Sequence, residues 1–143
     1  MNKLSPANIV ILAGGTVTLV GSFLNFYTYP GFNASANAWS GGSGFGVFGI
    51  ATVVVLCGIV MGAQVAVAAF ATGVRVPEKL LGLTWDQVHL ALGFQAALMM
   101  LAFLVRSKSP LDFGIGFWLM LLAGIALLVG AIMRFVGAGG RAA

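Results

Sequence analysis

The chain has 143 residues, of which 60% are hydrophobic and only 7% are charged, and its formal net charge is +4. Because ordinary soluble domains have about 25% charged residues, this composition excludes a soluble globule and indicates an integral membrane protein of one domain. The basic residues stand singly in flanks and loops, which is typical of topology signals and not of a nucleic-acid-binding patch. The single cysteine, Cys57, lies in an apolar run and predicts neither a disulfide nor a metal site.

Four long apolar runs follow one another along the chain, at about residues 6–27, 45–71, 85–105 and 111–135. Each has at least about 20 residues, the length that a helix needs to cross a hydrocarbon core of about 30 Å. Since the backbone must satisfy its own hydrogen bonds in lipid, these runs predict membrane-spanning helices. Their short connections predict an all-α fold, an up-down-up-down four-helix bundle in contact with the lipid bilayer.

Helix start signals precede three of the four runs. Ser5 and Pro6 suit the N-cap and the first position of the first helix. Thr84, followed by Gln87, predicts a capping box for the third helix. Asp112 is expected in the first turn of the fourth helix, where an acidic side chain suits the helix dipole.

The basic residues predict how the bundle is oriented. Placing the N-terminus inside leaves two basic residues outside, Arg106 and Lys108, against five on the cytoplasmic side. The five are Lys3, Arg75, Lys79, Arg134 and Arg141. Because basic residues are enriched on the cytoplasmic side, this distribution predicts that both termini are cytoplasmic. It places an outer loop at residues 28–44 and a cytoplasmic tail at residues 136–143.

Small residues spaced four apart predict where helices approach closely. These candidate packing residues are Gly58 and Gly62, Gly93 and Ala97, and Ala126 and Gly130, with Thr18 and Ser22 similarly spaced on the first helix. In lipid, such residues let helix backbones pack against each other. The contacts they form lie either within the bundle or with another membrane protein.

A few polar side chains inside the third and second runs are candidates for function. Asp86 and His89 are three residues apart, so they share one face of the third helix near its cytoplasmic end. They either relay a proton or sense pH, or they serve as a helix-dipole partner and an interfacial residue beside Trp85. Gln64 and Gln95 lie roughly 10 and 15 Å from the cytoplasmic boundary at about 1.5 Å per residue. With His89 they predict a polar ladder between the second and third helices, as interhelical contacts or as a path for protons, water or a quinone headgroup.

The sequence lacks the combinations of residues that catalysis usually requires. A single histidine cannot provide both axial ligands of a bis-histidine haem, and the chain has no metal-ligand cluster or phosphate-binding glycine loop. The spans contain almost no ionisable side chains, which argues against an ion-coupled carrier. We therefore expect a protein that is not an enzyme and binds no cofactor.

The outer loop is aromatic and carries no charge, which favours a position at headgroup level. It is expected to fold as a lid over the bundle or to press against a neighbouring subunit. The candidate partner-contact residues, in this loop and at the end of the run before it, are Asn25, Tyr27, Tyr29, Phe32, Asn37 and Trp39.

The junction of the first helix with this loop reads Ser-Phe-Leu-Asn-Phe-Tyr at residues 22–27, and Asn-Ala-Trp follows at residues 37–39. This pattern resembles a group of small actinobacterial four-span membrane proteins of unknown function, in which the helix ends in Ser-Phe-Leu-Pro-Trp-Tyr and the loop contains Asn-Ala-Trp. Asn25 stands where that group has proline, and Phe26 where it has tryptophan. The resemblance implies a four-span protein of the plasma membrane and supplies no catalytic residues.

Three functions remain open from the sequence. The first is a non-enzymatic subunit or accessory protein of a larger membrane complex, for example a respiratory or cell-envelope complex. The second is a homo-oligomeric channel or small-solute transporter with Gln64 and Gln95 in its pore. The third is a proton- or quinone-handling membrane protein that uses Asp86 and His89. The expected partners are other integral membrane proteins or further copies of the chain, and not nucleic acid.

Overall fold

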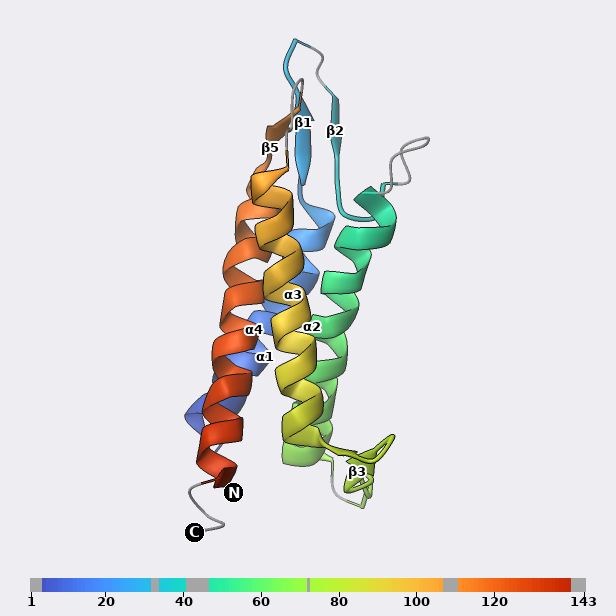
Figure 1. Ribbon diagram of the computed structural model, residues 1–143. Coiled ribbons are helices and arrows are strands. Elements are labelled where there is room, and N and C mark those ends of the chain that lie inside the picture. The colour runs from blue at the N-terminus through green and yellow to red at the C-terminus, as the bar shows by residue number, and fades with distance from the viewer. Residues whose placement is uncertain (1–3, 32–33, 41–46, 72, 107–110, 140–143) are drawn as a thin grey trace.

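The computed structural model describes residues 4–31, 34–40, 47–71, 73–106 and 111–139. Within them, the long helices are α1 (Pro6–Phe23), α2 (Val47–Phe70), α3 (Trp85–Val105) and α4 (Ile115–Gly139). They run alternately up and down, so that α1 begins and α4 ends at the same end of the bundle (Figure 1). We call this end the base and the opposite end the lid end. All four helices are long and apolar enough to cross a membrane, which confirms the all-α four-helix bundle and defines a multi-pass membrane protein.

The predicted starts of the first and third helices are confirmed by their hydrogen bonds. The Ser5 hydroxyl accepts from the backbone N–H of Asn8 at 3.3 Å, which caps α1. The Thr84 hydroxyl accepts from the N–H of Gln87 at 3.4 Å, and the Gln87 side chain accepts from the N–H of Thr84 at 3.0 Å. This reciprocal capping box satisfies two N–H groups that the helix leaves unpaired.

Two helix boundaries at the lid end were predicted wrongly. The first helix ends at Phe23 and not at residue 27, because Leu24 is extended with φ −85° and ψ 167°. The fourth helix begins at Ile115, so Asp112 is not in its first turn. In both places, residues that were predicted to be helical belong to short strands. These strands are β1 (Tyr27–Tyr29) and β5 (Asp112–Phe113). At the base, α4 continues to Gly139, so part of the predicted tail is helical.

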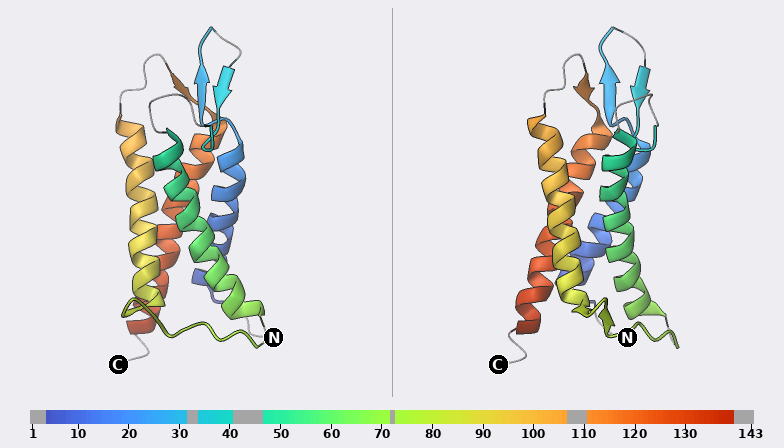
Figure 2. Two further views of the ribbon diagram at one scale, coloured as in Figure 1. Left: turned by 90° about the vertical axis from the view of Figure 1, so that its right-hand side faces the viewer. Right: turned by 45° about the vertical axis from the view of Figure 1, so that its right-hand side comes forward.

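The three strands at the lid end form one antiparallel sheet in the order β2-β1-β5, where β2 is Ala34–Ala36. Tyr27 lies opposite Ala36 on one side and opposite Phe113 on the other. The sheet stands beyond the helix ends in every view (Figure 2). A separate hairpin at the base joins α2 to α3 and consists of β3 (Lys79–Leu80) and β4 (Leu83–Thr84).

Small residues lie where the helices approach each other most closely. A Cβ on Gly15 of α1 would lie 2.7 Å from the carbonyl oxygen of Gly58 on α2, and a Cβ on Gly62 would have Gly15 as its neighbour at 4.0 Å. A Cβ on Gly93 of α3 would lie 3.0 Å from the Leu127 carbonyl oxygen of α4. The contacts at Gly15 and Gly93 leave no room for a side chain, so these two glycines set how closely α1 approaches α2 and α3 approaches α4.

The remaining candidate packing residues also lie within the bundle. A Cβ on Gly130 of α4 would lie 2.7 Å from the Ile11 side chain of α1. Ala97 is buried and Ala126 is half-buried. The small residues singled out from the sequence therefore contribute to internal packing.

The interior of the bundle is almost wholly apolar. Among the residues whose burial is described, the buried polar side chains are Thr18, Ser22 and His89. Thr18 donates to the carbonyl oxygen of Gly14 at 2.8 Å, which satisfies its hydroxyl without a partner helix. The fully buried large apolar side chains include Ile11, Val54, Met61, Met100, Met120 and Leu127. Large apolar side chains are also exposed on all four helices, as expected for surfaces that face lipid.

Candidate functional site

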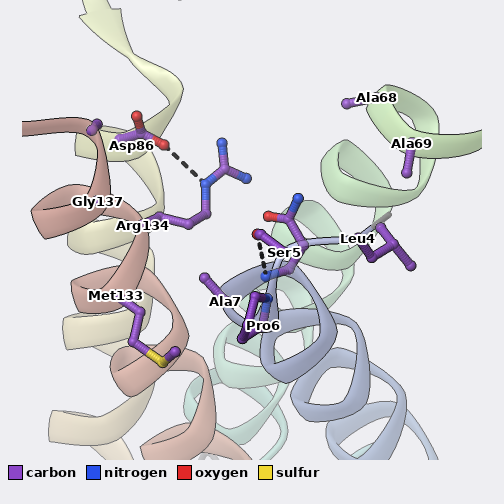
Figure 3. Close-up of a pocket in the computed structure, with 12 residues that line it drawn as sticks. Leu4, Ser5, Pro6, Ala7, Ala68, Ala69, Asp86, Met133, Arg134 and Gly137 are labelled. Carbon is purple, nitrogen blue, oxygen red and sulfur yellow. Dashed lines mark hydrogen bonds and ion pairs between the residues drawn. The ribbon is translucent and has the colours of Figure 1, made fainter. Parts of the chain in front are cut away.

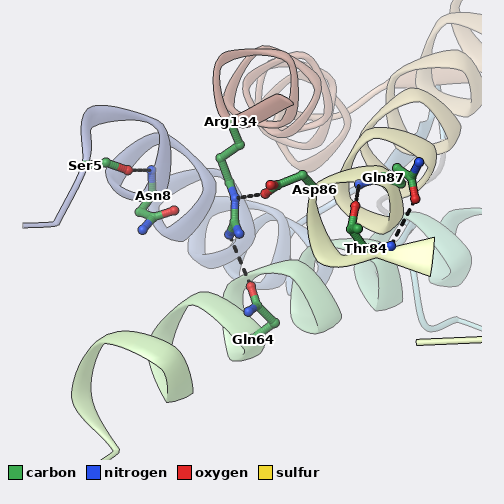
Figure 4. Close-up of polar contacts among 7 residues, drawn as sticks. All are labelled: Ser5, Asn8, Gln64, Thr84, Asp86, Gln87 and Arg134. Carbon is green, nitrogen blue, oxygen red and sulfur yellow. Dashed lines mark hydrogen bonds and ion pairs between the residues drawn. The ribbon is translucent and has the colours of Figure 1, made fainter. Parts of the chain in front are cut away.

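A polar cluster at the base joins three helices through one arginine. The Arg134 Nε of α4 donates to Asp86 Oδ1 of α3 at 2.9 Å, and its Nη1 donates to Gln64 Oε1 of α2 at 3.2 Å (Figure 4). The Arg134 and Asp86 side chains are 18% and 28% exposed, so the ion pair is partly sheltered from solvent. A hydrogen-bonded ion pair in such a setting is stronger than one on an open surface.

This arrangement differs from the two polar groupings that the sequence predicted. Asp86 pairs with Arg134 and not with His89, although Asp86 and His89 are on one helix. Gln64 bonds to α4 and not to α3, so no ladder of Gln64, Gln95 and His89 forms. Gln95 is half-buried on α3, and its side chain makes no hydrogen bond within the described residues. The ladder prediction was wrong because it did not include a long side chain from the fourth helix.

His89 is buried above the cluster, one helical turn from Asp86. Its side chain is fully buried, and neither ring nitrogen has a hydrogen-bond partner among the described residues. Its ring is edge-on to that of Trp85, with the two ring centroids 6.2 Å apart. A buried imidazole without hydrogen-bond partners is costly to the fold.

A pocket of about 530 Å³ opens beside the cluster, between the start of α1 and the ends of α2 and α4. Figure 3 shows the Arg134 guanidinium extended from α4 into the space toward α1. Asp86 and Asn8 also line the pocket, and Asn8 Oδ1 is buried without a hydrogen-bond partner in the described part of the chain. The apolar part of the lining includes Leu4, Ala7, Ala68, Ala69 and Met133.

The hairpin at the base presents an exposed apolar tip. Leu81 is 97% exposed and has φ 52°, and Gly82 follows with φ 85°. Positive φ at both central residues is typical of a type I′ turn, in which Asn and Gly are the favoured residues. The segment that leads into the hairpin is tied to α3, because the Trp85 Nε1 donates to the carbonyl oxygen of Pro77 at 2.7 Å. The hairpin also leads directly into α3, because Thr84 of β4 is the N-cap of that helix.

At the lid end, the sheet covers the bundle and inserts aromatic side chains into it. Phe26 is fully buried and makes edge-on contacts with Phe103 and Phe117, with ring centroids 5.2 and 5.4 Å apart. The backbone of this segment is also tied down, because the N–H of Phe26 donates to the Ala36 carbonyl oxygen at 2.7 Å and its carbonyl oxygen accepts from Gly114 at 2.9 Å. Phe26 thus anchors the sheet to α3 and α4.

The candidate partner-contact residues divide between the lid interior and its surface. Tyr27 is buried, and burial raises the pKa of its hydroxyl while the Arg106 charge opposes that shift. Trp39 is half-buried and donates from Nε1 to the Ser22 hydroxyl at 2.8 Å. Asn37 is half-buried and accepts from the N–H of Trp39 at 3.0 Å.

The other three candidates differ in their surroundings. Asn25 and Tyr29 are exposed and border a shallow pocket at the outer side of the sheet. Phe32 lies outside the described residues. The part of the loop that the structure describes is therefore chiefly a lid over the chain's own helices.

Arg134 and Leu81 are the residues that reasoning from the sequence did not single out as site residues. Arg134 was interpreted as an orientation signal. It is, however, an ionisable residue inside the fourth run at the depth of Asp86, and such a residue could have been recognised as a candidate site residue. Leu81 lies in a short loop, and a single apolar residue there does not indicate a site from the sequence alone. Within the described residues, no three metal-ligating side chains come together.

Comparison of the chain with protein-family models, with curated proteins and with solved structures found no match. Support for a function therefore comes from the chain's own residues and their geometry.

Proposed function

We propose that this multi-pass membrane protein is a non-enzymatic accessory subunit of a larger membrane complex, and that the hairpin at its base contacts the partner. The observation that supports this most is the Leu81 tip, which is 97% exposed at φ 52°. An L-residue in the left-handed region costs about 1–2 kcal/mol, and the exposed Leu81 side chain does not recover that cost by packing against the described residues. A residue that harms local stability and buries nothing is better explained by an intermolecular contact.

The rest of the hairpin has the character of a small docking surface. Leu80 and Leu83 flank the tip and are 38% and 46% exposed. Val74 adds a further apolar side chain, 60% exposed, on the segment that leads from α2. Figure 1 shows the hairpin standing clear of the helices at the base. Contacts of this kind, a fixed apolar anchor inserted into a pocket, dominate the energy of many protein interfaces.

The partner we favour is another integral membrane protein, with the contact on the cytoplasmic side. The cytoplasmic position follows from the predicted orientation, in which the positive-inside rule assigns the base to the cytoplasm. The proposal changes where contact is expected, because the sequence pointed to the outer loop. In the structure, Tyr27 and Trp39 of that loop face the chain's own helices.

The two other functions receive less support from the geometry. A pore through one chain would need a polar lining, whereas the large side chains buried in the described interior are apolar apart from His89 and Thr18. If the protein is a channel, its pore therefore lies between several copies of the chain. A proton relay through Asp86 and His89 lacks a bond between them, since Asp86 is engaged by Arg134.

A photo-crosslinking residue at position 81 tests the proposal directly. Incorporated in native membranes and irradiated, it is expected to give a covalent adduct with one other membrane protein. The matched control carries the same group at Ser35, which is exposed on the lid hairpin at the opposite end of the bundle. An adduct at Ser35 but not at position 81, or an adduct at position 81 with lipid alone, would contradict the proposal.

A further inference from the structure

We infer that the pocket at the base binds the headgroup of a zwitterionic phospholipid, with its phosphate on Arg134 and its ammonium group toward Asp86. The pocket is independent of the hairpin tip and of the proposed partner contact. Its place is suited to lipid, because it lies at the start of the α1 span and the end of the α4 span. Helix ends of membrane-spanning segments coincide with the headgroup region of the bilayer.

The guanidinium has donors left over for a phosphate. Arg134 uses Nε for Asp86 and Nη1 for Gln64. Since a guanidinium carries five N–H groups, three remain beyond these two bonds. Figure 3 shows the Arg134 side chain extended away from α4 into the pocket, toward the start of α1. Phosphate oxygens are the acceptors that arginine binds best in a planar, forked geometry.

The acceptors in the pocket complement the positive part of the headgroup. The Asp86 carboxylate lines the pocket and gives only its Oδ1 to Arg134 in the ion pair. Asn8 Oδ1 is buried there without a donor, and a buried acceptor that stays unpaired is costly. An ammonium group has three N–H donors, which suit a carboxylate such as that of Asp86.

The charge balance distinguishes a zwitterion from a simple anion. Arg134 and Asp86 contribute one positive and one negative charge to the pocket. A headgroup with phosphate alone would place its negative charge beside the Asp86 carboxylate, which would repel it because no additional positive charge is present. A headgroup with both phosphate and ammonium can satisfy both charges at once.

The walls provide an exit for the acyl chains. Ala68 is exposed and Met133 is 41% exposed, so the apolar lining continues onto the lipid-facing surface of the bundle. A volume of about 530 Å³ is in the range of small-molecule sites and too small for whole acyl chains. The headgroup is thus expected inside and the chains outside.

The test uses the full chain, purified in detergent and depleted of lipid. Native mass spectrometry measures binding of phosphatidylethanolamine, phosphatidylglycerol and free phosphoethanolamine. We expect phosphatidylethanolamine to bind most tightly, and Arg134→Gln to weaken it about tenfold or more, because a hydrogen bond to a charged group is lost. The control Arg106→Gln changes an exposed basic residue at the lid end and is expected to bind like the wild type.

A second variant keeps the polar cluster intact. Ala68→Phe fills the pocket from its exposed wall and is expected to lower lipid binding while the unfolding midpoint without lipid stays unchanged. Three results would overturn the inference: equal binding by Ala68→Phe and the wild type, phosphatidylglycerol binding as tightly as phosphatidylethanolamine, or free phosphoethanolamine binding as tightly as the lipid. The last result would assign the pocket to a soluble phosphate ester.

Discussion

The Arg134–Asp86 ion pair links α4 to α3 at 2.9 Å, and its two partners are expected to respond unequally to removal. Asp86→Ala leaves the Arg134 charge without its partner in a partly sheltered site. Breaking a fully buried pair costs about 3–5 kcal/mol, whereas exposed pairs contribute about 0.2–1 kcal/mol. With side chains 18% and 28% exposed, the expected loss lies between these limits, at about 2 kcal/mol.

Arg134→Met is expected to cost less, about 1 kcal/mol, because Asp86 keeps its favourable place in the first turn of α3. The double variant is expected to cost less than the sum of the single ones, by a coupling free energy of about 1 kcal/mol. The assay is equilibrium unfolding in mixed micelles, with Arg75→Met as a control at an exposed basic residue. Additive losses with no coupling, or a larger loss for Arg134→Met than for Asp86→Ala, would refute this account of the base.

Three further predictions concern packing and the lid, each measured on the purified chain. Gly15→Leu is expected to destabilise the fold by about 1–3 kcal/mol, since a Cβ there would lie 2.7 Å from an α2 carbonyl oxygen, whereas Gly62→Ala, with its nearest neighbour at 4.0 Å, should have little effect. Phe26→Ala is expected to cost about 3–5 kcal/mol, because a fully buried ring is lost; a loss below 1 kcal/mol would show that the lid is not anchored there. In a Tyr29→Phe chain, the absorbance of the remaining tyrosine should titrate above pH 10, since burial raises the pKa of Tyr27. The contribution of Tyr27 to the free energy of unfolding is then complete below pH 10 and is lost as the pH rises toward the pKa of the folded state. A titration of Tyr27 at or below pH 10 would contradict this prediction.

Local sequence patterns predicted the parts of the fold that depend on neighbouring residues. The third helix was predicted at residues 85–105 and is found at Trp85–Val105, because its capping box and apolar run are continuous in the chain. Among the small residues at a spacing of four, Gly93 and Gly130 lie where an added Cβ would be 3.0 Å or less from the facing helix. Each of these signals depends on residues only a few positions apart.

Contacts between distant residues had no comparable signal. Thr28 of β1 pairs with Asp112 of β5 in the lid sheet, although the two residues are 84 positions apart. No pattern in the sequence indicated this pairing, so residues of both strands were predicted to be the ends of helices. Arg134 and Asp86 are 48 positions apart, and their pairing depends on how α3 and α4 align in the bundle. The positive φ of Leu81 was also hidden, because leucine is not a residue that predicts such a turn. The orientation, the partner and the particular membrane stay predictions.

The measurement that tests the proposed function most directly is a comparison of what co-purifies with the chain from native membranes in mild detergent. Leu81→Asn removes the apolar tip but suits its left-handed backbone, so the variant is expected to fold at least as stably as the wild type. Tyr29→Asn is the matched control at an exposed residue of the lid. We predict that one membrane protein is retained by the wild type and by Tyr29→Asn and is lost from Leu81→Asn. A wild type that purifies alone, or a partner lost only from Tyr29→Asn, would contradict the assignment of the base hairpin as the docking surface.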